Sequence, residues 1–321
     1  MGAGAVGGFY GAALAERGHA VTFVARGEHL DALRERGLTI RSGGRSTVLY
    51  PVHAVADPAE AGDRFDLVLF TVKGYDTEPA ARGLRPAVSA QTTVLTLQNG
   101  VESGDRLGAV PGADRVLVGT TLIATTIAEP GVIDQTNPIR RIELGEPSGE
   151  VTPRLESVAA ALRDAGVEVR VTTDVRRAVW EKFIRLAPGA TLATACRATI
   201  GLVRSTPEGA ALYRALIAET VAVGRGVGAT LPADAIETAV ALIQTLPADM
   251  RTSMQLDFER RHRVELEEIT GAVVRLGRHV NVPTPVYDLL YAVLRVRAAT
   301  FGGLGGGLGG GSGGGSGGGS G

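Results

Sequence analysis

The sequence has little of several features that mark particular classes of protein. Among its 321 residues there is one cysteine, Cys196, which excludes an internal disulfide framework and a zinc site built from cysteines. Its 33 basic and 34 acidic residues nearly cancel, which argues against a basic nucleic-acid-binding or membrane-binding surface. No run approaches the roughly 18 apolar residues of a membrane span, and the N-terminus does not resemble a signal peptide. We therefore expect a cytoplasmic protein with a small-molecule partner, and no metal.

Lysine is also scarce. Of the 33 basic residues only Lys73 and Lys182 are lysines, so nearly every cation is an arginine. An arginine keeps its proton, whereas a lysine ammonium can release its proton near neutral pH in a suitable environment. The two lysines are therefore candidate functional residues, with chance survival as the alternative.

The length corresponds to about two domains, and the first has an α/β pattern. Short β-branched runs alternate with helical segments, a rhythm typical of a parallel sheet with crossover helices. A first domain is predicted over residues 1–172. Its expected strands lie at 21–25, 66–72, 92–97, 116–120, 131–134, 141–144 and 167–172, and its expected helices at 8–17, 30–36 and 153–165.

The remainder of the chain has a helical pattern followed by a low-complexity end. Residues 173–301 are expected to form an all-α second domain, with helix breaks at Pro188, Pro207, Pro232, Pro247 and Pro283. Residues 302–321 are rich in glycine and serine, which is typical of a flexible tail or linker.

The chain opens with a glycine loop that runs into a predicted helix. In such a loop the first glycine permits a tight turn, the second lets the backbone approach a pyrophosphate, and the third allows close helix packing. The βαβ spacing to the strand at 21–25 favours a dinucleotide site over a merely glycine-rich loop. The G-x-G-x-x-G pattern comprises Gly2, Ala3, Gly4, Ala5, Val6 and Gly7.

Only Met1 precedes this loop, where a Rossmann-type sheet has its first strand. We therefore expect that strand to be missing here, and the natural chain to begin further upstream. Such a loss would remove hydrogen-bonding partners from both neighbouring strands.

Charged and polar residues follow several predicted strands. Arg26 comes after the second strand, where it suits a 2′-phosphate and favours NADP, while Glu28 leaves NAD as the alternative. Lys73 and Asn99 each follow a later strand, at the edge where open parallel sheets bind ligands. Loop solvation of Lys73 and an Asn-Gly turn at Asn99 are the structural alternatives.

Three residues of the predicted helical domain are further candidates. Lys182 lies on a helix at the border between an exposed face and an apolar stripe, which fits either a cleft lysine or one that reaches out to water. Ser253 and Glu265 flank a charged stretch, residues 257–263, between two helical patterns. Glu265 has an alternative role in complementing a helix dipole.

In order and spacing, these segments resemble the ketopantoate reductase (2-dehydropantoate 2-reductase) family. Besides the glycine loop, the resemblance is carried by VARG at 24–27, TVK at 71–73, QNG at 98–100, VGTT at 118–121, WEKF at 180–183, TSMQLD at 252–257 and VELEEITG at 264–271.

The resemblance implies an N-terminal Rossmann-type NADP-binding domain, an all-α second domain and an active site between them. Lys182 matches the family's catalytic lysine and Glu265 its acidic partner, while Ser253 and Asn99 match substrate-binding positions. The glycine loop, Arg26, Lys73 and Asn99 match positions that hold NADPH. The implied reaction is NADPH-dependent reduction of a 2-oxo acid, nominally ketopantoate to D-pantoate in pantothenate biosynthesis. Reductases with such helical domains often dimerise, so a homodimer is one expectation.

The sequence departs from the family pattern after the lysine. Leu186 and Ala190 stand where the family carries asparagines that contact the hydroxylated substrate, and Thr270 stands where it often has asparagine. An apolar wall cannot select for a substrate hydroxyl in the way a hydrogen-bonding group can. A paralogue that reduces a more apolar 2-oxo acid is therefore one alternative. A non-catalytic NADPH-binding protein is another, because the first strand of the sheet is expected to be missing.

Overall fold

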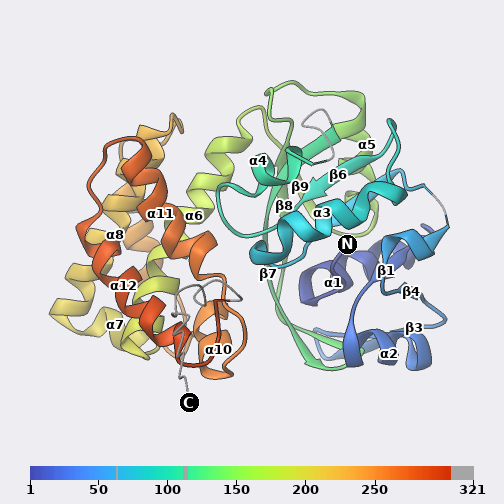
Figure 1. Ribbon diagram of the computed structural model, residues 1–321, viewed down its shortest axis with the longest axis horizontal. Coiled ribbons are helices and arrows are strands. Elements are labelled where there is room, and N and C mark those ends of the chain that lie inside the picture. The colour runs from blue at the N-terminus through green and yellow to red at the C-terminus, as the bar shows by residue number, and fades with distance from the viewer. Residues whose placement is uncertain (63, 111–114, 305–321) are drawn as a thin grey trace, which may run out of the picture.

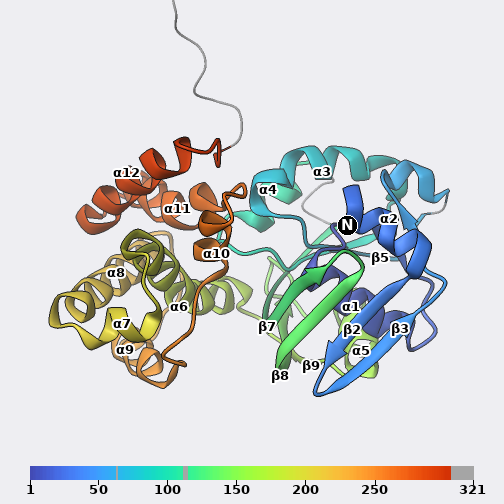
Figure 2. The same ribbon diagram turned by 90° about the horizontal axis from the view of Figure 1, so that it is seen from below.

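The computed structural model describes residues 1–62, 64–110 and 115–304, which form two lobes (Figures 1 and 2). Strands and helices alternate up to Val171, and in the described residues helices alone follow from Val175. We call these parts the sheet lobe and the helical lobe. The predicted tail at 302–321 lies outside the described residues from residue 305 onward.

The predicted elements of the sheet lobe are present, although their bounds differ. They are α1 (Ala5–Ala15), β1 (Thr22–Val24), α2 (Gly27–Arg36), β5 (Leu67–Phe70), β6 (Thr93–Thr96), β7 (Val116–Glu129), β8 (Val132–Gly145), α5 (Pro153–Asp164) and β9 (Glu168–Val171). Five further elements are not predicted by the sequence pattern: β2 (Leu38–Ser42), β3 (Arg45–Leu49), β4 (His53–Val55), α3 (Thr77–Leu84) and α4 (Ser103–Gly108). Nearly all of β3 is exposed, so the strand has no apolar alternation to reveal it.

The parallel core of the sheet is confirmed, with antiparallel additions that the sequence did not predict. Strands β5, β6 and β7 pair in parallel, and so do β1 and β4. The large sheet has the order β3-β2-β8-β7-β6-β5, and β9 also pairs with β8. Strands β7 and β8 form one long antiparallel hairpin. The sequence pattern predicts only three short strands here, at 116–120, 131–134 and 141–144, because polar residues interrupt the apolar runs.

Residues 1–3 connect the two sheets by lying between β1 and the end of β5. The amides of Gly2 and Ala3 both donate to the Val24 carbonyl of β1, at 3.2 and 2.8 Å. On the other side, the Thr71 amide donates to the Met1 carbonyl at 3.0 Å, just beyond β5. In the described residues no strand lies between β1 and β5.

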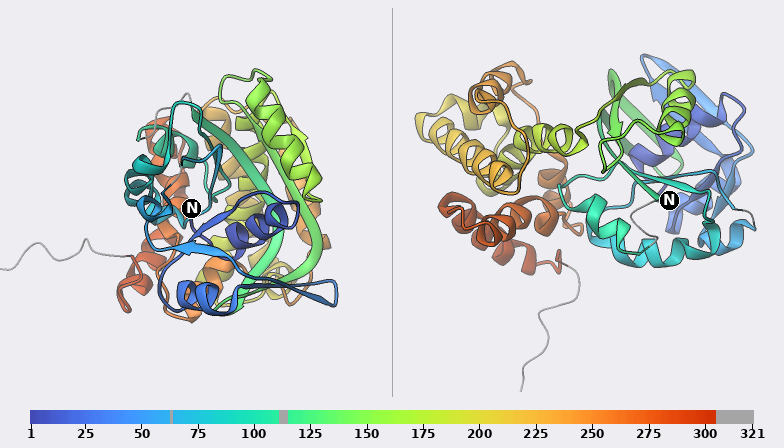
Figure 3. Two further views of the ribbon diagram at one scale, coloured as in Figure 1. Left: turned by 90° about the vertical axis from the view of Figure 1, so that its right-hand side faces the viewer. Right: turned by 90° about the horizontal axis from the view of Figure 1, so that it is seen from above.

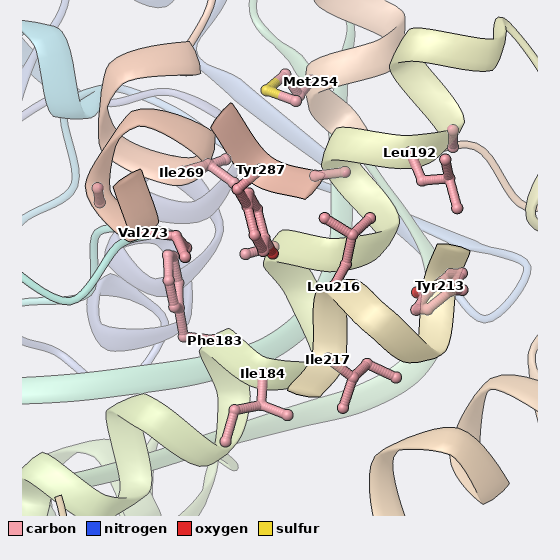
Figure 4. Close-up of a cluster of buried hydrophobic side chains, with 14 of the residues drawn as sticks. Phe183, Ile184, Leu192, Tyr213, Leu216, Ile217, Met254, Ile269, Val273 and Tyr287 are labelled. Atoms are coloured by element: carbon pink, nitrogen blue, oxygen red, sulfur yellow. The ribbon is translucent and has the colours of Figure 1, made fainter. Parts of the chain in front are cut away.

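The helical lobe packs around one apolar core, part of which Figure 4 shows. Its helices are α6 (Val175–Cys196), α7 (Ile200–Ser205), α8 (Pro207–Gly226), α9 (Ala235–Thr245), α10 (Ser253–Glu259), α11 (Leu266–His279) and α12 (Pro285–Ala299). Figure 3 shows α6, in yellow-green, entering this lobe from the sheet lobe. Helix α6 also contacts β7 and β8, so residues near its start lie beside the sheet.

The prediction of a helix break at Pro188 is wrong, whereas the other four prolines do lie at helix starts or between helices. Helix α6 continues through Pro188 to Cys196. A proline inside a helix removes one backbone hydrogen bond and costs about 3 kcal/mol. Ala187, Ala190 and Leu192 on either side of it are at most 3% exposed. We attribute the continuous helix to this burial, which offsets the cost of the proline.

Candidate active site

The first feature of the site is a half-buried lysine with a neutral partner. Lys182, in the second turn of α6, donates from Nζ to the Asn99 Oδ1 at 3.0 Å. Asn99 follows β6, so this bond joins the helical lobe to the carboxyl edge of the sheet. Burial lowers the pKa of Lys182 to about 8, with Glu265 acting to raise it and Arg185 to lower it further. Lys182 can therefore release a proton near neutral pH.

A small pocket that is partly open to solvent lies beside this lysine. Both polar and apolar side chains line it, a combination that suits a small acid with an aliphatic substituent. The lining residues are Gln98, Asn99, Gly100, Gly119, Thr120, Val179, Lys182, Phe183 and Leu186.

The second feature is a lysine held by two carboxylates. Lys73 donates from Nζ to Asp257 Oδ2 at 3.0 Å and to Glu265 Oε2 at 3.1 Å. Burial acts to lower the pKa of Lys73, but Glu265 and Asp257 outweigh it and raise the pKa above its ordinary value. This ammonium stays charged across the physiological range, and it ties the end of β5 to the helical lobe.

Glu265 is only 4% exposed and lies immediately before α11. It makes no capping bond to its own helix. Instead its Oε1 accepts from the Gly74 amide at 3.0 Å while Oε2 accepts from Lys73. The helix-dipole interpretation is therefore insufficient, because the carboxylate is directed at the other lobe.

The glycine loop has the shape that its pattern predicts. Gly2 has φ +85°, and a Cβ there would lie 2.8 Å from the Val72 amide nitrogen. A Cβ on Gly7 would lie 2.2 Å from the Thr71 Oγ1, whereas a Cβ on Gly4 would meet no atom of the described chain within 4 Å. Gly4 precedes α1 and provides no side-chain cap for it. The start of α1 is thus open at Gly4, the glycine that the pattern expects to lie against a pyrophosphate.

Arg26 and Ser253 lie apart from these contacts. Arg26 is exposed and directly precedes α2, two residues after the Val24 carbonyl that binds the glycine loop. Ser253 is exposed at the first position of α10. Among the described residues, the structure gives neither side chain a hydrogen bond to the other candidates.

Two partners of the candidate residues are not predicted by the sequence patterns. Asp257 and the Gly74 amide bind Lys73 and Glu265, and no spacing rule links these four residues in the sequence. Of the positions that depart from the family pattern, Leu186 lines the pocket.

The other two departures lie in the core of the helical lobe. Ala190 is 3% exposed, and the Thr270 hydroxyl is buried 2.8 Å from that of Thr191. A hydroxyl engaged in the core does not take the place of a substrate-binding asparagine in the pocket.

The fold and site define an oxidoreductase with a Rossmann-type lobe and a helical lobe. The family model described as "Ketopantoate reductase PanE/ApbA" matches residues 1–149, and that of the "Ketopantoate reductase PanE/ApbA C terminal" matches residues 174–298. The chain belongs to the ketopantoate reductase family.

Among the described residues, we find no helix with the length and apolar character of a membrane span.

Curated relatives match over nearly their whole length. The 2-dehydropantoate 2-reductase of Halobacterium salinarum is 33% identical, with 92% of this chain and 97% of the relative covered. The 2-dehydropantoate 2-reductase of Mesorhizobium japonicum is 30% identical, with 94% and 98% covered.

Solved structures share the same fold. The PanE/ApbA family ketopantoate reductase from Ralstonia eutropha JMP134 superposes with a TM-score of 0.86 at 32% identity, covering 94% of this chain and 97% of the other. A D-mandelate dehydrogenase solved with NADH and anilino(oxo)acetate also reaches 0.86, over 94% and 97%, but at 20% identity it shares the fold alone.

Proposed function

We propose that this protein reduces a 2-oxo acid to a 2-hydroxy acid with NADPH, and that its substrate is ketopantoate, giving D-pantoate for pantothenate biosynthesis in the cytoplasm. The observation that supports this most directly is the pair of Lys182 and Asn99 in a pocket at the carboxyl edge of the sheet. A homodimer is the assembly that we expect.

The chain's residues fit a dinucleotide phosphate. The open position at Gly4 and the uncapped start of α1 would receive the pyrophosphate in the loop Gly2, Ala3, Gly4, Ala5, Val6 and Gly7. Arg26 would take the 2′-phosphate, and Lys73 and Asn99 would complete the site at the neighbouring strand ends. When bound, NADPH supplies the hydride that reduces the keto carbon.

Lys182 then provides the charge and the proton. As negative charge grows on the carbonyl oxygen, the ammonium stabilises it and transfers a proton to it, leaving a neutral amine that solvent reprotonates. A pKa of about 8 suits this exchange, since the ammonium is acidic enough to give its proton yet still present at neutral pH.

The other residues orient the reacting groups. Asn99 Oδ1 fixes the ammonium by accepting its hydrogen bond, and Glu265 favours the charged form of Lys182 while holding the Lys73 loop. The Ser253 hydroxyl would donate to the substrate carboxylate. Val179, Phe183 and Leu186 keep water from one side of the pocket.

Steady-state oxidation of NADPH with ketopantoate tests the proposal, with a reaction lacking substrate as the control. We expect saturable turnover that requires ketopantoate. Binding of NADPH without turnover would contradict the proposed reaction and would favour the alternative of a non-catalytic NADPH-binding protein.

One observation favours a second candidate substrate. Leu186 lines the pocket one turn after Lys182, where an apolar side chain offers nothing to a substrate hydroxyl. An enzyme for an apolar 2-oxo acid would turn over 2-oxoisovalerate with a higher kcat/KM than ketopantoate, and the opposite ranking would reject this candidate.

A further inference from the structure

Glu268 of α11 occupies a position between two loops of the sheet lobe. A Cβ on Gly74 would lie 2.5 Å from the Glu268 Cγ, and a Cβ on Gly100 would lie 3.1 Å from the Glu268 carbonyl oxygen. Each glycine directly follows a site residue, since Gly74 comes after Lys73 and Gly100 after Asn99. Glu268 thus packs against both loops as closely as glycine allows.

The Glu268 side chain is itself fixed. It is 8% exposed, and its Oε1 lies 3.5 Å from the Arg106 Nη1. Arg106 in turn donates from Nε and Nη2 to the two carboxylate oxygens of Glu78, at 2.8 and 2.9 Å. This arrangement links α11 to α4 and α3, which follow the two loops in the chain.

The carboxyl of Glu268 does not behave as an ordinary surface acid. Its Oε2 is buried and has no hydrogen-bond partner in the described part of the chain. Burial raises the pKa of Glu268, although Arg106 opposes the rise. A neutral side chain of the same shape should therefore replace it at little cost.

The Asn99–Gly100 loop borders two pockets. Asn99 and Gly100 line the Lys182 pocket and also a second pocket that Glu268 and Arg106 line. A change in the Glu268 side chain would therefore alter the position of Asn99, which accepts the hydrogen bond of Lys182.

We propose that Glu268 is a positioning residue for the reaction. Its side chain packs on Gly74 and pairs with Arg106 of α4, the helix that follows the Asn99–Gly100 loop. These contacts fix the loops that carry Lys73 and Asn99, and through Asn99 the bond to Lys182. This inference rests on the proposed function. It assigns Glu268 no contact with substrate or cofactor, and it requires the shape of the side chain rather than its charge.

Kinetics of Glu268→Ala and Glu268→Gln test the inference against the wild-type enzyme. Small misplacements of reacting groups cost up to about 10²-fold in rate, so we expect Glu268→Ala to lose between about 10-fold and 100-fold in kcat with little change in KM for NADPH. Glu268→Gln should keep kcat within about threefold, since it preserves the shape. The matched control is Glu267→Ala on the same helix, whose carboxylate instead accepts from the Tyr291 hydroxyl. A folded Glu268→Ala enzyme with unchanged kcat would overturn the inference, as would equal losses in the Ala and Gln variants.

The contact with Gly74 gives a second test, in which both single variants are compared with a double variant. Gly74→Ala alone should clash with Glu268 and reduce kcat, because its new Cβ meets the Glu268 Cγ. In the double variant Gly74→Ala/Glu268→Ala the Cγ is absent, and the closest remaining approach is the 3.2 Å to the Cβ of residue 268. We therefore expect a combined loss of kcat smaller than the sum of the two single losses. Additive losses in the double variant would show that the contact does not act on the site.

Acetylation of the two lysines separates this inference from the proposed function. Peptide mass spectrometry reads Lys182 and Lys73 individually, whether or not the protein turns over ketopantoate. Losing the hydrogen bond of Lys182 to Asn99 should speed its acetylation in Glu268→Ala by about fivefold, the factor for one net hydrogen bond. An inactive wild type with this increase would reject only the proposed function. An active wild type without the increase in Glu268→Ala would reject the positioning role.

Discussion

The surroundings of the chain's two lysines differ in what they do to the same functional group. Lys73 is bonded to two carboxylates, Asp257 and Glu265, and its pKa is raised. Lys182 is bonded to the neutral amide of Asn99, and burial lowers its pKa to about 8. Both lysines lie where the sheet lobe meets the helical lobe. Burial alone therefore does not decide protonation, because paired carboxylates outweigh it at one site and not at the other.

The comparison assigns different tasks to the two sites. An ammonium held by two carboxylates is a permanent charge that ties the lobes together. An ammonium with one neutral partner can lose its proton during a reaction. Glu265 acts on both, since it binds Lys73 directly and raises the pKa of Lys182 through space.

The largest expected effect comes from removing the labile lysine. Lys182→Ala should lower kcat/KM for the best 2-oxo acid by about 10²-fold to 10⁴-fold, the range for a lost general acid. Steady-state kinetics measure this. Lys182→Arg is the matched control, and it should stay impaired because a guanidinium keeps its proton. A loss much smaller than tenfold in Lys182→Ala would assign the proton to another group.

A smaller effect is expected from the carboxylate that acts on both lysines. Glu265→Gln should lower the free energy of unfolding by about 1–3 kcal/mol, because a buried charged acceptor is lost. It should also move the alkaline fall of kcat/KM to lower pH, because Glu265 raises the pKa of Lys182. Chemical denaturation and a pH profile measure the two effects.

Asp257→Asn is the control for this prediction. Asp257 also binds Lys73, but it does not contribute to the pKa shift of Lys182. If the decrease of kcat/KM at alkaline pH moved equally in Glu265→Gln and Asp257→Asn, the claim that only Glu265 acts on both lysines would be contradicted.

The smallest effect concerns the choice of cofactor. Lys73 is already occupied by carboxylates, whereas Arg26 is exposed at the end of β1. Arg26→Ala should therefore reduce the preference for NADPH over NADH by about tenfold, the value of a charged hydrogen bond. Lys73→Ala should change that preference by less. Titration of both variants with each cofactor measures it, and an unchanged ratio in Arg26→Ala would reject the assignment of Arg26.

Local patterns predicted the parts of this structure that depend on neighbouring residues. The loop from Gly2 to Gly7, the βαβ rhythm and the helices of the second lobe follow from turn geometry and apolar periodicity, and all are present. Trp180 lies on an apolar face of its helical pattern, which indicates a core residue, and it is 3% exposed.

Contacts between distant segments could not be predicted in this way. The bonds of Lys73 to Asp257 and of Gly74 to Glu265 join residues more than 180 positions apart, since their separations are 184 and 191. The position of Glu268 between two glycines likewise depends on how the lobes meet. The continuous helix through Pro188 depends on burial, which local propensity does not describe.

The most direct test of the account is the pH dependence of kcat/KM for ketopantoate reduction. The reaction requires the ammonium of Lys182, which is present below its pKa and lost above it. We expect kcat/KM to be level at neutral pH and to fall tenfold per pH unit above about pH 8. In the oxidation of D-pantoate the neutral amine is required, so that rate should rise through the same pH range. A reduction rate that stays level to about pH 10 would contradict the role of Lys182 as proton donor.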